Sequence, residues 1–278
     1  MWLLMALMGS ASAVPTAAEV ARRHPDAPVV IAHRGASLVA PENTLTAYRQ
    51  AMEQGAQVAE TDVHLSQDGA VIVIHDKTLD RTTDGRGKVA EQNLGVLRTL
   101  DAGAWFGVAH VGEPLPTLAK LLALVRDKMV LCIEIKAKPD EGGERIAARI
   151  RDLLDASGGR DQAIIFSFYP RQIAAAKAAM PEVPALFLVE PRKGAVPYPT
   201  GVLTMARSLG ADLIGLDQRR TTAAFVAQAQ AAGFPVFVYT VDAPARIQAM
   251  VEAGVDGIIT NAPAATQQQV DAITRSRR

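Results

Sequence analysis

The chain has 278 residues, of which 49% are hydrophobic, so it is long enough to form one large domain with a sizeable core. Lys and Arg number 29, as do Asp and Glu, so the formal net charge is zero. A neutral chain lacks the broad basic surface that binds nucleic acid or an anionic membrane, and no nucleic-acid partner is expected. The one cysteine, Cys132, excludes an internal disulfide and any multi-cysteine zinc site, and its apolar run MVLCIEI predicts a buried, inert thiol.

The first element in chain order is an apolar leader. Trp2–Met8 is apolar, and the small residues Ala11 and Ala13 follow it, which predicts a signal peptide over residues 1–13 that is cleaved after Ala13. This predicts export to the periplasm or secretion; an uncleaved extension and a cytoplasmic location are the alternative. The leader is too short to span a bilayer, and no later segment is apolar enough, so no integral membrane segment is expected in the mature chain.

Short apolar runs alternate with amphipathic segments along the rest of the chain. Continuous apolar strands between helices predict a parallel sheet covered by helices, and eight such units predict a closed (β/α)8 TIM barrel over about residues 27–265. A C-terminal tail is expected over residues 266–278. A doubly wound open sheet is the alternative, disfavoured because no GxGxxG motif follows the first strand. The predicted strands are Val29–Ala32, Val58–Leu65, Met129–Ile135, Ala163–Ser167, Ala185–Val189, Leu213–Leu216, Val236–Thr240 and Gly257–Thr260. The clearest predicted helices are Asn43–Gln54, Glu144–Ala156, Pro170–Met180, Thr222–Ala232 and Ala243–Ala253.

A weak internal repeat supports the barrel. GAQVAETD, GADLIGLD and GVDGIITN each begin with a glycine suited to a helix C-terminus, continue as a short apolar strand and end on a polar residue. The last residues of these segments are Asp62, Asp217 and Asn261. We expect them at the C-terminal ends of strands, the face that carries the active site in such barrels.

One region breaks the alternation. Residues of about 77–116 are rich in turn formers and show little periodicity. We interpret this segment as an excursion inserted after the second strand, forming a small cap over the barrel mouth. Long loops of this kind are usually functional.

Acidic residues recur at strand positions two apart. Glu60 and Asp62 share one face of their predicted strand, and Glu134 and Lys136 repeat the spacing on the next barrel strand. Three carboxylates on adjacent strands match the oxygen ligands of a hard divalent cation. The alternative is a structural salt-bridge network that also includes Arg34.

Two histidines close apolar runs. His33 ends VVIAH and is followed by Arg34, and His75 ends AVIVIH. Together they predict an acid/base pair, with the Arg34 guanidinium holding an oxyanion. His64 follows the alternation of the acidic residues and is a weaker candidate ligand.

The charge of the candidate site indicates the substrate. The three carboxylates, one divalent cation and the side chains of Arg34 and Lys136 leave one positive charge. A singly charged phosphodiester would neutralise it, whereas a neutral sugar would not. Bidentate arginine contacts and metal coordination are usual means of holding phosphate.

Several motifs occur together over about Val29–Pro263. They are AHRG, PENT, ETDVHLSQDG, IHDKTLDRTTDG, EIK, VYTVD and GVDGIIT. In this combination the chain resembles the glycerophosphodiester phosphodiesterase family. The resemblance implies a (β/α)8 barrel with a small segment inserted after the second strand. It also implies one Ca²⁺ or Mg²⁺ site made by Glu60, Asp62 and Glu134.

The resemblance implies the chemistry as well: hydrolysis of glycerophosphodiesters to glycerol 3-phosphate and an alcohol. His33 and His75 match the family's acid/base pair, and Arg34 and Lys136 match its phosphate contacts. One histidine would take a proton from water or from the glycerol 2-hydroxyl, and the other would protonate the leaving alcohol. The sequence leaves open which histidine does which.

Two residues depart from the family's pattern and affect the expected specificity for the leaving alcohol. Tyr239 stands where Trp is common, and Asn261 stands where Asp is common. We expect the pocket rim to include four residues. They are Glu42, Phe168, Asp217 and Tyr239.

Other functions stay open at this stage. A lysophospholipase D, or a phospholipase C-type enzyme that stops at a cyclic phosphate, would need an apolar approach for acyl chains, for which Trp105 and Phe106 in the excursion are candidates. A non-catalytic phosphodiester-binding protein is the alternative from a different class. The oligomeric state cannot be read from these patterns.

Overall fold

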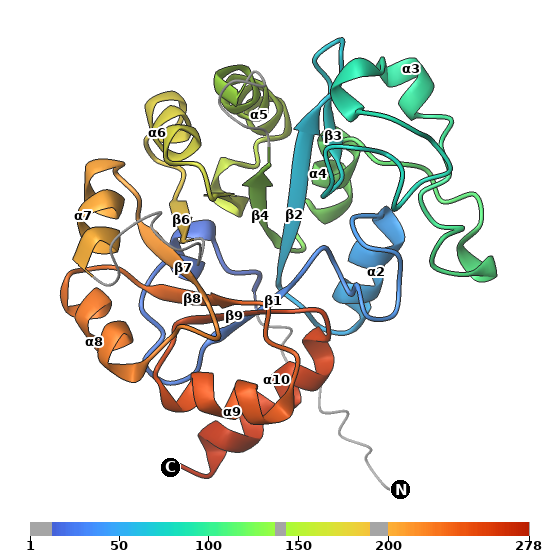
Figure 1. Ribbon diagram of the computed structural model, residues 1–278. Coiled ribbons are helices and arrows are strands. Elements are labelled where there is room, and N and C mark those ends of the chain that lie inside the picture. Colours follow the sequence, from blue (N-terminus) through green and yellow to red (C-terminus); the bar gives the residue numbers. More distant parts are fainter. Residues whose placement is uncertain (1–12, 137–142, 190–199, 278) are drawn as a thin grey trace, which may run out of the picture.

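The computed structural model describes residues 13–136, 143–189 and 200–277. Eight parallel strands form a closed barrel in which β1 pairs with both β2 and β9, and helices surround it (Figure 1). The predicted TIM barrel is therefore confirmed. Residues 1–12 of the predicted signal peptide lie outside the described residues. No helix within the described ranges is long and apolar enough to cross a membrane.

The barrel strands match the apolar runs of the sequence closely. In barrel order they are β1 (Val29–Ala32), β2 (Val58–Leu65), β4 (Val130–Ile135), β5 (Ala163–Ser167), β6 (Ala185–Val189), β7 (Leu213–Asp217), β8 (Val236–Tyr239) and β9 (Gly257–Thr260). The helices that follow them are α2 (Leu45–Glu53), α4 (Leu118–Val125), α5 (Gly143–Ser157), α6 (Pro170–Ala179), α7 (Thr200–Ser208), α8 (Ala223–Ala231), α9 (Pro244–Glu252) and α10 (Pro263–Arg275). A short α1 (Ala17–Val20) precedes β1, and a 3-10 turn, η4 (Arg160–Gln162), precedes β5.

Alternate residues of each strand fill the barrel interior. This inner cluster includes Ile31, Val58, Cys132, Phe166, Leu188, Phe237 and Ile259, so the predicted burial of Cys132 is confirmed. Ala17 and Val20 of α1 join the cluster, so the segment before β1 seals one end of the barrel. Gly257 faces the Phe237 ring across paired strands, and a Cβ there would come within 2.5 Å of that ring. A larger residue at 257 would therefore overpack the interior.

The run containing His75 folds differently from a barrel strand. Its strand β3 (Val71–Val73) pairs antiparallel with the outer half of β2, so the two form a hairpin. The amide of Ile74 donates to the Asp62 carbonyl at 3.0 Å. The hairpin thus turns the chain back toward the mouth and brings His75 level with the acidic residues of β2.

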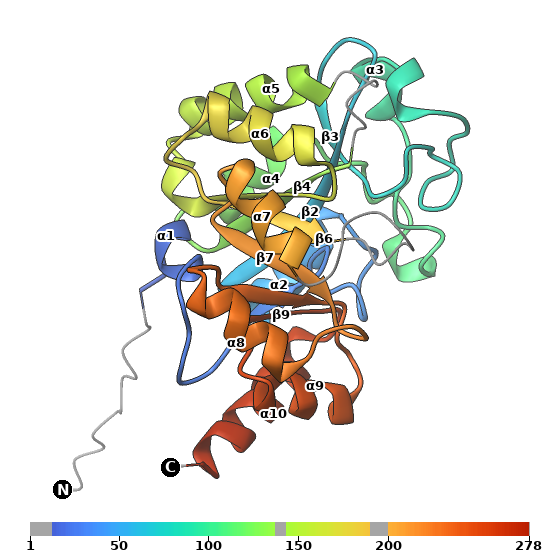
Figure 2. The ribbon, with the colours of Figure 1, turned by 60° about the vertical axis from the view of Figure 1, so that its left-hand side comes forward.

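The excursion after β3 lies beside the hairpin, to one side of the barrel (Figure 1, Figure 2). It contains η1 (Val89–Glu91), α3 (Leu94–Leu97) and η2 (Val108–His110). Its apolar residues form a separate small cluster with the hairpin: Ile72, Ile74, Leu79, Val89, Leu97, Ala102 and Leu115. This separate core holds the segment against the hairpin, and the cap over the mouth stays a prediction.

The C-terminal tail expected over residues 266–278 is instead mostly helical. α10 runs from Pro263 to Arg275, with Thr266 and Val270 buried against the barrel. Its Ala- and Gln-rich sequence gives little apolar contrast, which hid the helix from the pattern. The last helix of the barrel therefore extends well past residue 265.

Replacing Val270 by Asp tests this packing. Val270 is fully buried, so the carboxylate would enter an apolar site, and we expect unfolding free energy to fall by about 3 kcal/mol or more. Gln268→Asp, on the exposed side of the same helix, is the control. Its unfolding free energy should stay within about 0.5 kcal/mol of the wild-type value. Urea denaturation measures both. A stable Val270→Asp variant would show that α10 is dispensable.

Candidate active site

Three carboxylates meet at the C-terminal end of the barrel. Glu60 and Asp62 point inward from β2, and Glu134 points inward from β4, whose register places it beside Asp62. All three are buried, and one ligand oxygen of each lies within 4.8 Å of the others. The i, i+2 spacing seen in the sequence thus becomes a cluster of like charges.

The pKa values of the cluster reflect this crowding. Burial, together with the charges of Asp62 and Glu134, raises the pKa of Glu60 well above its usual range. Burial raises the pKa of Glu134 to about 7, although Lys136 opposes the shift. Burial also opposes ionisation of Asp62, but Arg34 and Lys136 outweigh it and hold the pKa of Asp62 below its usual range.

Two basic side chains border the cluster. Arg34 Nε lies 3.2 Å from Asp62 Oδ2, and the Arg34 amide donates to Glu60 Oε2 at 3.0 Å. Lys136 Nζ lies 2.9 Å from a Glu134 oxygen and 3.7 Å from Asp62 Oδ1. The residues expected to hold phosphate therefore stand directly against the candidate metal ligands.

Backbone geometry positions Arg34. Its φ is 57°, a left-handed value that is uncommon outside glycine, and Gly35 follows at 83°. A Cβ at Gly35 would lie 2.6 Å from the Ala47 carbonyl carbon, so only glycine fits this turn. The turn aims the Arg34 side chain and amide at the carboxylates.

Asn43 is a site residue that the sequence did not single out. Its Nδ2 donates to Asp62 Oδ2 at 2.8 Å, and its Oδ1 accepts from the hydroxyl of Tyr48 at 3.0 Å. Its φ of 60° is again left-handed. The only signal was its place in the PENT motif, where an asparagine tolerates this conformation. Asn43 fixes the orientation of the Asp62 carboxylate.

His33 lies at the end of β1 with its ring oriented by an amide. Its Nδ1 is 2.7 Å from Asn261 Oδ1, and Asn261 Nδ2 donates to Asp242 at 2.6 Å. Because a carboxylate only accepts, this second bond fixes which end of the Asn261 amide faces His33. His33 Nδ1 therefore carries the hydrogen, which leaves Nε2 free to accept a proton. Burial, reinforced by Arg34, lowers the pKa of His33 to about 4.

His75 is backed by a carboxylate instead. Its Nδ1 lies 2.6 Å from Asp76 Oδ1, and its Nε2 lies 3.0 Å from Lys136 Nζ. Burial lowers the pKa of His75, while Asp62 and Asp76 act in the opposite direction. His64 donates from Nε2 to the His75 carbonyl at 3.1 Å, so the ring of this weaker candidate ligand supports the hairpin.

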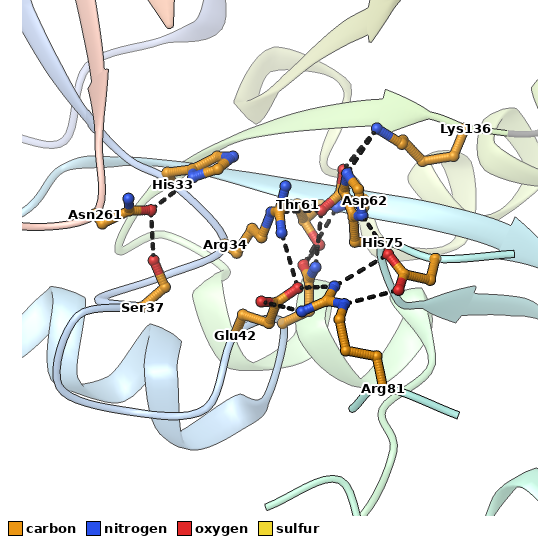
Figure 3. Close-up of polar contacts among 12 residues, drawn as sticks. His33, Arg34, Ser37, Glu42, Thr61, Asp62, His75, Arg81, Lys136 and Asn261 are labelled. Atoms are coloured by element: carbon orange, nitrogen blue, oxygen red, sulfur yellow. Dashed lines mark hydrogen bonds and ion pairs between the residues drawn. The ribbon is translucent and has the colours of Figure 1, made fainter. Parts of the chain in front are cut away.

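The two histidines line one cavity of about 150 Å³ together with Arg34, Lys136 and two of the three carboxylates, and Figure 3 shows the polar contacts around it. Its lining is charged on one side and apolar on the other: His33, Arg34, Glu60, His75, Glu134, Lys136, Phe166, Phe168, Leu188, Tyr239, Thr240 and Ile259. The rings of Phe168 and Tyr239 meet edge to face at 5.5 Å, and the Tyr239 hydroxyl donates to the Val189 carbonyl at 2.6 Å. These two rim residues form a fixed aromatic wall.

The other two residues expected at the rim lie elsewhere. Asp217, at the end of β7, pairs with Arg219 and does not line the cavity. Glu42 also stands outside the lining, where it accepts from Arg34 at 2.8 Å and pairs with Arg81. Asp217 lies at a strand end as predicted, but the sequence pattern did not indicate that Arg219 would pair with it.

The arrangement combines carboxylates, two cations and two imidazoles at the mouth of a TIM barrel. This defines an enzyme site for an anionic substrate whose reaction needs proton transfer.

The match to known proteins specifies the class. Residues 33–265 match the model of the glycerophosphoryl diester phosphodiesterase family. The chain belongs to this family, and it is a phosphoric diester hydrolase of the glycerophosphodiester phosphodiesterase type.

Individual relatives agree over most of their length. The chain is 36% identical to a glycerophosphodiester phosphodiesterase of Caldanaerobacter subterraneus subsp. tengcongensis, covering 84% of this chain and 94% of the relative. It is 32% identical to one from Bacillus subtilis (strain 168), covering 86% and 85%. The fold is similar to an Oleispira antarctica phosphodiesterase solved with the product sn-glycerol-3-phosphate, with a TM-score of 0.82, 30% identity and coverage of 88% and 97%.

The acidic cluster fits a divalent cation. Within the described part of the chain, no hydrogen-bond donor pairs with Glu60 Oε1 or Asp62 Oδ1, although both atoms are buried. Burying such oxygens without partners is costly, and a hard cation with oxygen ligands would satisfy them. Glu60, Asp62 and Glu134 are the residues that would hold it.

The repulsion among the three buried carboxylates predicts how metal and pH together affect the stability of the fold. Because the pKa values of Glu60 and Glu134 are raised above the ordinary 4.5, the metal-free fold loses stability as pH rises from there, up to about 7 for Glu134 and further for Glu60, since each must ionise while buried. A cation relieves this repulsion. Saturating Mg²⁺ or Ca²⁺ should therefore raise Tm by roughly 5 °C or more at pH 8, and by less at pH 6.

Calorimetric unfolding with and without metal at both pH values measures this difference. Glu134→Gln is the matched variant, in which the metal effect should shrink. A Tm increase that is the same at pH 6 and pH 8 would contradict the role of these carboxylates.

Proposed function

We propose that the protein hydrolyses glycerophosphodiesters to glycerol 3-phosphate and an alcohol by metal-dependent catalysis with two histidines. The observation that carries this proposal is the shared cavity. His33 and His75 face it together with Arg34, Lys136 and two of the three clustered carboxylates. A phosphodiester placed there would meet its charge partners and two proton carriers at once.

The charged groups would bind the phosphate. A Mg²⁺ or Ca²⁺ ion held by Glu60, Asp62 and Glu134 would supply Lewis-acid polarisation of a phosphoryl oxygen. Arg34 and Lys136 would contact the other oxygens. These cations stabilise the negative charge that builds up as the phosphorus is attacked.

The partners of the two histidines indicate separate roles. His33 Nε2 carries no hydrogen, because Asn261 holds the hydrogen of the ring on Nδ1. An unprotonated Nε2 suits a general base. Asp76 favours the protonated form of His75, which suits a general acid once Nε2, here the acceptor of the Lys136 ammonium, has taken up a proton. His33 would take the proton of the attacking hydroxyl, and His75 would protonate the leaving alkoxide. The attacking group is water, or the glycerol 2-hydroxyl with a cyclic phosphate that water then opens.

The cavity favours a small diester over a lipid. At about 150 Å³ it accommodates a phosphate with a short alcohol, and its apolar lining among the described residues consists of Phe166, Phe168, Leu188, Tyr239 and Ile259. Trp105 and Phe106 meet edge to face within the excursion and are absent from the described lining of the cavity. They therefore give no support to acyl-chain binding in a lysophospholipase D or a phospholipase C-type enzyme.

Histidine variants test the roles. His33→Ala and His75→Ala should each lower kcat on glycerophosphocholine by at least about 10²-fold. With a p-nitrophenyl glycerophosphodiester, whose leaving group needs no proton, His75→Ala should lose much less, whereas His33→Ala should lose as much as before. Steady-state kinetics on both substrates measures this. Equal losses for His75→Ala on the two substrates would refute its role as the acid.

Metal dependence has a direct test. Release of glycerol 3-phosphate from glycerophosphocholine should stop after treatment with a chelator and return when Mg²⁺ or Ca²⁺ is restored. Full activity in the chelated, metal-free enzyme would refute the metal-dependent mechanism.

The place of action is a separate proposal. The leader over residues 1–13 supports export to the periplasm or secretion. N-terminal sequencing of protein recovered from cells should find Val14 as the first residue. An intact Met1 would refute cleavage.

A further inference from the structure

Arg81, in the excursion, connects the two halves of the catalytic site. Its guanidinium donates to both oxygens of Asp76 at 2.7 and 3.0 Å, and to both oxygens of Glu42 at 2.8 Å each (Figure 3). We propose that Arg81 is a positioning residue that holds His75, through Asp76, and Arg34, through Glu42, in their catalytic orientations.

One arm of this arrangement reaches the proposed acid. Asp76 Oδ1 accepts from Arg81 and also lies 2.6 Å from His75 Nδ1. With both carboxylate oxygens engaged by the guanidinium, Asp76 cannot rotate away from the imidazole. Arg81 therefore sets the plane of the His75 ring without touching it.

The other arm reaches the proposed phosphate contact. Glu42 Oε1 accepts from Arg34 Nη1 and from Arg81 Nη2, each at 2.8 Å. Arg81 thus shares the negative charge of Glu42. Without it, Glu42 would bind Arg34 as its one cationic partner in this set and compete with the substrate phosphate for the same guanidinium.

The residue type and its support fit this role. Two bidentate pairs from one side chain need the planar fork of a guanidinium, which lysine lacks. Arg81 stands on a turn anchored by the buried Leu79, whose carbonyl accepts from the Thr83 hydroxyl at 2.7 Å. Its own side chain is 43% exposed, so small solutes can reach the place it occupies.

The first experiment removes the guanidinium and then returns it. Arg81→Ala should lower kcat by about 10- to 100-fold through misplacement of His75, and raise KM as Arg34 is drawn to Glu42. Millimolar guanidinium should restore part of kcat, whereas urea should not. Arg81→Lys should stay close to Arg81→Ala. The matched control is Arg86→Ala, which removes an 82% exposed arginine from the same segment and should match wild type.

Several outcomes would overturn the proposal. One is Arg81→Ala with wild-type kcat and KM. Another is a loss of activity that guanidinium cannot restore although circular dichroism and Tm match wild type. A third is Arg81→Lys with full activity, because one ammonium cannot replace two bidentate pairs.

The inference rests on the proposed function, and one measurement separates the two. Calorimetric binding of sn-glycerol 3-phosphate reports on Arg34 without turnover, and Arg81→Ala should weaken it at least several-fold relative to Arg86→Ala. An inactive wild-type protein would contradict the proposed function alone, since this comparison would still test Arg81. Equal affinities in the two variants would overturn the link to Arg34.

Discussion

Three like charges held out of water are the constraint on which the rest of the site depends. Glu60, Asp62 and Glu134 could not remain buried together in ionised form unless cations surrounded them. Arg34 and Lys136 supply part of that compensation, and the unsatisfied carboxylate oxygens call for a further cation. In the proposed function the same positive groups attract a phosphodiester, so that stability and substrate binding depend on the same charges.

The β2–β3 hairpin has a second effect, which is to place His33 and His75 on two sides of one cavity. His33 comes from a barrel strand, as residues in this fold usually do. His75 instead follows β3, the antiparallel strand that pairs with the end of β2. β2, which bears Glu60 and Asp62, is thus also the strand that pairs with β3 and so positions His75.

Much of this could be predicted from the sequence, since apolar runs mark buried strands and residues two apart share a face. This was enough to group Glu60, Asp62 and Glu134. It failed in three places, for three different reasons. Arg81 sits in a turn-rich segment whose pattern gives no hint that it meets Glu42. Asp217 lies at a strand end as expected, yet it forms an ion pair with Arg219, two residues further on. α10 was missed because alanine and glutamine show no apolar face.

The separate core of the excursion has an evolutionary consequence. The hydrogen bonds described for residues 95–112 stay within the excursion, and its apolar cluster packs on the hairpin rather than inside the barrel. Substitutions at exposed positions of that stretch, such as Val96 and Val108, can therefore accumulate with little effect on the reacting groups. These positions offer natural selection, or a protein engineer, a place to change the surface beside the barrel while the reacting groups stay as they are.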